Sequence, residues 1–63
     1  MMKDLMIAWA MEHEFEHEDG TWSRADEAGN AVGPRHATHE ELTTALWNYM
    51  AEYPECYLPM RNA

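Results

Sequence analysis

The string with the most evident chemical potential is residues 13–17, which read His-Glu-Phe-Glu-His. It fits the pattern H-E-x-x-H, in which two histidines one helical turn apart bind zinc and the glutamate activates water. His13, Glu14 and His17 would take these roles if the segment were helical. On a strand the two histidines would lie about 13 Å apart, too far to share one ion. We therefore expect no metal ion, no cofactor and no catalytic residue. A small zinc-dependent hydrolase is the alternative interpretation.

The carboxylates form a second candidate site. Twelve Asp and Glu stand against four Lys and Arg, which gives a net charge of −8. On a strand, Glu12, Glu14 and Glu16 would project from one face about 6.8 Å apart, and Asp19 would extend this acidic face. Such a row resembles the phosphates of a nucleic-acid strand, which are spaced a few ångströms apart. The row predicts either contact with a basic groove or a solvated face that keeps the chain soluble.

Trp47 is the remaining candidate contact, because it lies off the apolar stripe of the helix predicted around it. An exposed tryptophan is a typical interface anchor, but this one could equally cover residues 57–60. His36 and His39 fit surface positions near the start of that helix. Cys56 fits a small apolar position, since no base neighbours it in the sequence.

The second half of the chain predicts one helix over residues 39–53. Thr38 and Glu41 have the spacing of a capping box, and Pro54 stops the helix. One apolar stripe recurs at helical spacing between these signals: Leu42, Ala45, Leu46, Tyr49, Met50 and Tyr53.

The first half is ambiguous between helix and strand. Met, Ala and Glu favour a helix over residues 3–18, whereas large residues at every odd position from Leu5 to His17 have the period of a strand. We predict the strand over residues 5–17. A two-residue turn at Asp19-Gly20 would pair it with residues 21–26, so that His17 faces Trp22 and Phe15 faces Arg24.

The remaining signals complete an α+β fold. A turn at residues 28–30 leads to a short third strand at residues 31–32, and residues 56–60 are the candidate for a C-terminal edge strand. We therefore predict one domain over residues 1–63, a three-stranded antiparallel meander packed on one α-helix.

Composition limits both stability and location. Aliphatic core residues are scarce, but three Trp, three Tyr and six Met supply apolar area, so we expect a folded domain that a dimer partner or a target helps to stabilise. Cys56 is the one cysteine, which excludes an internal disulfide and is typical of a reducing cytoplasm. The longest apolar run, residues 5–11, is too short to span a bilayer. The acidic balance argues against direct contact with nucleic acid or an anionic membrane.

The residues Ala37-Thr38-His39-Glu40-Glu41-Leu42, followed by Trp47-Asn48-Tyr49, resemble the helix of the short T7-type RNA polymerase inhibitor. The small size and acidity are similar to those of other bacteriophage proteins that disable host machinery, such as anti-CRISPR proteins. The hairpin–strand–helix order also resembles HicB-type antitoxin domains. These resemblances imply a function in binding, and they assign no role to an individual residue.

The sequence as a whole thus predicts a cytoplasmic, non-enzymatic protein that binds and inhibits or modulates a nucleic-acid-handling enzyme. We expect the contact to involve Glu12, Glu14, Glu16, Asp19 and Trp47, with nucleic-acid mimicry as its mechanism.

Overall fold

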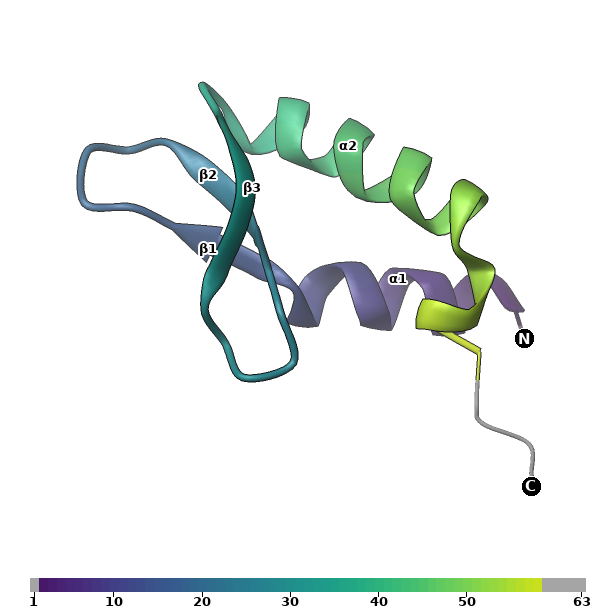
Figure 1. The fold of residues 1–63 in the computed structure, drawn as a ribbon. Coiled ribbons are helices and arrows are strands. Elements are labelled where there is room, and N and C mark those ends of the chain that lie inside the picture. Colours follow the sequence, from purple (N-terminus) through teal and green to yellow (C-terminus); the bar gives the residue numbers. More distant parts are fainter. Residues whose placement is uncertain (1, 59–63) are drawn as a thin grey trace.

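A computed structural model describes residues 2–58 of the chain as two α-helices and a three-stranded antiparallel sheet (Figure 1). Along the chain lie α1 (Met2–Glu12), β1 (Glu14–Glu16), β2 (Trp22–Ala25), β3 (Ala31–His36), α2 (His39–Glu52) and the 3₁₀ turn η1 (Pro54–Cys56). The strands follow one another in the sheet in the order β1-β2-β3. The predicted α+β class and antiparallel meander are confirmed, but the fold contains an additional helix.

That additional helix corrects the strand predicted over residues 5–17. The segment forms α1, a turn at His13 and the short strand β1. The period of two suggested that the odd-numbered residues share one buried face of a strand. They do not, because Leu5, Ile7 and Met11 are 41%, 41% and 69% exposed. The helical preference of Met, Ala and Leu prevails, and α1 buries Trp9 and Ala10 instead.

The first hairpin differs from its predicted register by one residue. Glu14 pairs with Arg24, and Glu16 with Trp22. The loop has three residues rather than two: the N–H of His17 donates to the carbonyl of Thr21 (2.8 Å), and Gly20 has a φ of +88°. A shift of one residue moves side chains to the other face of a strand. Glu14 and Glu16 therefore share a face with Trp22 and Arg24.

The second hairpin uses the same kind of loop, with Asp26 and Asn30 at its ends and Gly29 in the left-handed conformation. It leads into β3, which is longer than the predicted residues 31–32. Trp22 pairs with His36 and Arg24 with Val32, so residues 33–35 form a bulge opposite Ser23. This irregular strand lies at the edge of the sheet, where a proline is tolerated.

The second helix agrees closely with its prediction. The hydroxyl of Thr38 accepts a hydrogen bond from the N–H of Glu41 (3.1 Å), and the Glu41 carboxylate accepts one from the N–H of Ala37 (3.1 Å). Tyr53 is the C-cap and Pro54 begins η1. The predicted edge strand is wrong for residues 56–58, where the chain forms η1 and a turn. Residues 59–60 of that prediction lie outside the described residues.

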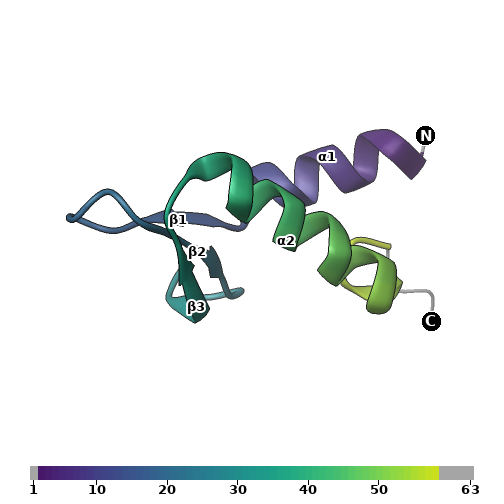
Figure 2. The same cartoon turned by 90° about the horizontal axis from the view of Figure 1, so that it is seen from above.

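The core lies between the two helices and the sheet. Leu42, Leu46 and Met50 of α2 are at most 1% exposed, and Trp9 and Ala10 of α1 pack with them. Figures 1 and 2 show both helices extending from the sheet toward the same end of the molecule, while the β1–β2 loop projects at the opposite end.

This core assignment predicts that Leu46→Ala lowers the free energy of unfolding by about 3 kcal/mol, because the removed methyl groups leave a cavity. Met11→Ala is the matched control and should change it by less than about 0.5 kcal/mol, since Met11 is 69% exposed. Urea unfolding followed by circular dichroism measures both values. Similar losses in the two variants would contradict the assignment.

Candidate partner-binding surface

The predicted row of glutamates is divided between two elements. Glu12 ends α1, whereas Glu14 and Glu16 belong to β1 and point to one face of the strand. A single strand face carrying all three carboxylates is therefore wrong, because the helix extends to Glu12.

Glu14 and Glu16 also differ in their surroundings. The Glu14 carboxylate lies 2.9 Å from Nε2 of His39 at the start of α2, and its side chain is only 22% exposed. Trp22 packs edge-on against the same imidazole, with ring centroids 4.7 Å apart. Glu14 thus helps to join the sheet to α2, while Glu16 is exposed. Of these two carboxylates, Glu16 is the one available to a partner.

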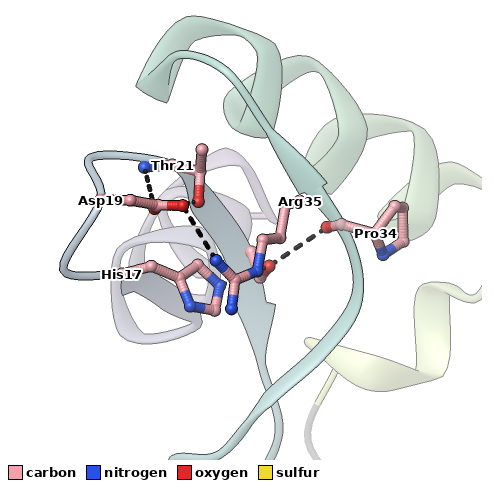
Figure 3. A network of polar contacts seen from close by, with 6 residues as sticks. His17, Asp19, Thr21, Pro34 and Arg35 are labelled. Carbon is pink, nitrogen blue, oxygen red and sulfur yellow. Dashed lines mark hydrogen bonds and ion pairs between the residues drawn. The ribbon is translucent and has the colours of Figure 1, made fainter.

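Asp19 is exposed, but it braces the β1–β2 loop. One carboxylate oxygen accepts hydrogen bonds from the N–H (3.0 Å) and hydroxyl (2.6 Å) of Thr21, and the other lies 3.1 Å from Nη1 of Arg35 on β3 (Figure 3). The Thr21 hydroxyl and N–H, followed by the charges of Arg35 and His17, lower the pKa of Asp19. Asp19 is therefore ionised at neutral pH, and Arg35 partly offsets its charge.

His17, at the base of this loop, forms a hydrogen-bonded pair with Ser23 that the sequence did not predict. Nε2 of His17 lies 2.9 Å from Oγ of Ser23, and the Ser23 hydroxyl donates to the carbonyl of Pro34 (3.2 Å). A serine hydroxyl has one proton, so Oγ must accept from the N–H of His17. Nucleophilic catalysis needs the opposite arrangement and an accessible oxygen, whereas Ser23 is 1% exposed. The pair therefore holds the β3 bulge in place.

The two histidines of the H-E-x-x-H string have separate partners. Nδ1 of His13 donates to the carbonyl of Trp9 (2.7 Å), and Nε2 lies 3.4 Å from the Glu27 carboxylate. The residues between His13 and His17 form β1 rather than the helix that the zinc interpretation requires. Within residues 2–58, no three His, Cys, Asp or Glu side chains are grouped so that they could hold a metal ion.

Trp47 and Cys56 are both half-buried and pack against the core. Trp47 thus uses part of its ring for packing, which leaves less of it for a partner than the anchor hypothesis assumed. Burial and the neighbouring Glu55 raise the pKa of the Cys56 thiol. The thiolate is the reactive form of cysteine, so Cys56 is a weak nucleophile at neutral pH.

Three exposed carboxylates around β1 remain unneutralised: Glu12, Glu16 and Glu18. None of them is within 4.0 Å of a cationic nitrogen among the described residues. Glu18 lies in the projecting β1–β2 loop and Glu16 at the adjoining end of β1 (Figure 2). We call these three residues the acidic hairpin surface.

Comparison of the chain with protein-family models, curated proteins and solved structures finds no match. In residues 2–58, neither helix has the length and apolar character needed to cross a membrane.

The Asp19 geometry predicts that Thr21→Val raises the pKa of Asp19 toward about 3.9, the value of an unperturbed aspartate, because the strongest hydrogen bond is lost. Arg35→Gln should raise it less, since the charge of Arg35 contributes less than the Thr21 hydroxyl. A lowered pKa adds stability above the unfolded-state pKa, and this stability is lost as pH falls through the folded-state pKa.

Carboxyl ¹³C NMR titration of Asp19 measures these shifts. Thr44→Val, an exposed substitution on α2, is the control and should leave the titration unchanged. A Thr21→Val protein with the wild-type Asp19 pKa would contradict the assignment.

Proposed function

We propose that this protein acts by binding, and that the acidic hairpin surface docks into a basic groove of a nucleic-acid-handling enzyme and inhibits or modulates it. The observation that carries the proposal is that Glu12, Glu16 and Glu18 are exposed and lack a cationic partner in residues 2–58. An exposed carboxylate without a nearby cation gains energy when a partner supplies positive charge.

The position of this surface also favours contact. The β1–β2 loop projects from the rest of the molecule in both views (Figures 1 and 2), so Glu18 can enter a concave site. The net charge of −8 adds long-range attraction to a basic partner and accelerates association. The resemblance to small acidic bacteriophage inhibitors agrees with this proposal.

The structure also changes which residues should be tested. Replacing Glu14 or Asp19 would disturb the contacts with His39, Thr21 and Arg35, so a loss of binding would be ambiguous. Glu16 and Glu18 make no such contacts and can be reversed without breaking an internal interaction.

We predict that Glu16→Lys with Glu18→Lys weakens partner binding by more than tenfold, because like charges then face the groove. The control is Glu52→Lys with Glu55→Lys, which changes the net charge by the same amount at the other end of the molecule. Affinity capture from bacterial lysate supplies the candidate partner, and calorimetry with the purified partner at low and physiological salt measures the affinity. Wild-type binding should weaken as salt rises.

Circular dichroism must first show that both double variants are folded. Equal losses in the two variants would attribute binding to net charge alone, and no loss in either would make the acidic hairpin surface a solubility feature. If a nucleic acid bound by the partner competes with this protein, mimicry is supported; simultaneous binding of both would contradict it.

A further inference from the structure

A cavity of about 220 Å³ lies between the sheet and α2, and no residue of the acidic hairpin surface lines it. Its walls are mostly apolar, with Val32 and Pro34 of β3 opposite Leu42 and Leu46 of α2. Small residues leave the space open: Gly33 stands in the β3 bulge, and Ala45 is the short side chain on the facing helix. An engineered apolar cavity of about 150 Å³ accommodates benzene, so this one has room for a single ring with a short substituent.

The lining also contains Tyr49 and two nitrogen-bearing side chains, Arg24 and His36. In a chain with twelve carboxylates, Arg24 has no carboxylate within 4.0 Å among the described residues. Its cross-strand neighbour Glu14 pairs with His39 instead. The Arg24 guanidinium lies 4.3 Å from the centroid of the Tyr49 ring, which holds it beside the apolar space.

We propose that this cavity binds a small amphipathic carboxylate, with a ring or short alkyl chain against Val32, Pro34 and Ala45 and the carboxylate on Arg24. The guanidinium has five N–H donors in a planar fork that matches a carboxylate. A half-buried, unpaired cation gains more from such a contact than a fully solvated one. His36 lies on the same lining and can donate a further hydrogen bond.

The shape of β3 favours a free small acid over a peptide added as a further strand. Strand addition needs a regular row of backbone groups at the sheet edge. The bulge at residues 33–35, the positive φ of Gly33 and the missing N–H of Pro34 interrupt that row. The cavity can still admit one ring from solvent.

The test uses 3-phenylpropionate and its neutral amide, 3-phenylpropanamide, as probes in ¹⁵N-HSQC titrations of the full chain. We expect saturable shifts centred on the cavity residues for the acid, with a dissociation constant in roughly the millimolar range or below, as is usual for so small a ligand. The amide should bind at least fivefold more weakly, because it loses the charge-assisted pair with Arg24.

Two variants separate the parts of the site. Arg24→Gln should remove the preference for the acid over the amide while the amide binds as before. Ala45→Leu should fill the cavity and weaken both probes by more than tenfold, and thermal unfolding must show that this variant keeps its fold. Binding of the acid that is unaffected by Ala45→Leu, or equal affinity of wild type for acid and amide, would overturn the proposal.

A third probe is an acetylated tetrapeptide ending in Phe, which carries the same ring and carboxylate at a chain terminus. Tighter binding of this peptide than of 3-phenylpropionate would overturn the proposal in favour of a C-terminal peptide ligand. These outcomes are independent of the Glu16 and Glu18 variants, so failure of this site and failure of the proposed partner surface are distinguishable.

Discussion

The arrangement of the elements depends on the packing of Trp9 against Tyr49. The two rings stack with centroids 5.7 Å apart and planes within 5° of parallel, and this contact joins α1 to α2. The Arg24 guanidinium lies over the Tyr49 ring and adds β2 to the same group. His13 stacks on Trp9 at 4.2 Å, so the turn between α1 and β1 is fixed by the same indole. The Trp9–Tyr49 pair therefore connects α1, α2 and β2 in a chain that has few aliphatic residues.

This dependence has a cost at the indole nitrogen. Nε1 of Trp9 is buried and has no hydrogen-bond partner in residues 2–58. An unsatisfied buried donor costs about 1–3 kcal/mol, and the apolar area that a tryptophan buries offsets this cost. The position of α1 is thus determined by hydrophobic area rather than by hydrogen bonding. The core is small and contacts only one narrow face of α1. Leu5, Ile7 and Met11 lie outside that face and remain exposed.

The sequence predictions are accurate where structure depends on residues close together in the chain, and they fail where it depends on contacts between distant segments. The α2 helix was predictable because its cap, its stop and its apolar stripe are all local signals. The strand predicted over residues 5–17 failed because an alternating pattern does not reveal which large residues find a buried partner, and only Trp9 and His13 do so at the odd positions of α1 and the turn. The hairpin register failed because Asp-Gly serves both two-residue and three-residue loops, and the choice here places Gly20 third in the loop.

The candidate sites show the same division. That Glu16 is exposed could be expected from its type, but the pairing of Glu14 with His39 depends on how α2 returns to the sheet, which no local pattern indicates. The cavity could not be predicted from local patterns either, because its lining residues come from three separate elements, β2, β3 and α2.

The distribution of charge links the two proposed sites. Arg35 pairs with Asp19 and Arg24 contacts the Tyr49 ring, and neither cation lies within 4.0 Å of Glu16 or Glu18. The hairpin consequently keeps a negative surface, while a positive group remains beside the cavity on the α2 side of the sheet. Glu16 and Arg24 are diagonal neighbours on one face of the β1–β2 pair, a spacing of about 7–8 Å, so the charge of each contributes to the electrostatics of both sites. Within residues 2–58, Arg24 lines the cavity and no carboxylate side chain does, so the proposed anion site has a positive nearest charge although the chain carries a net charge of −8.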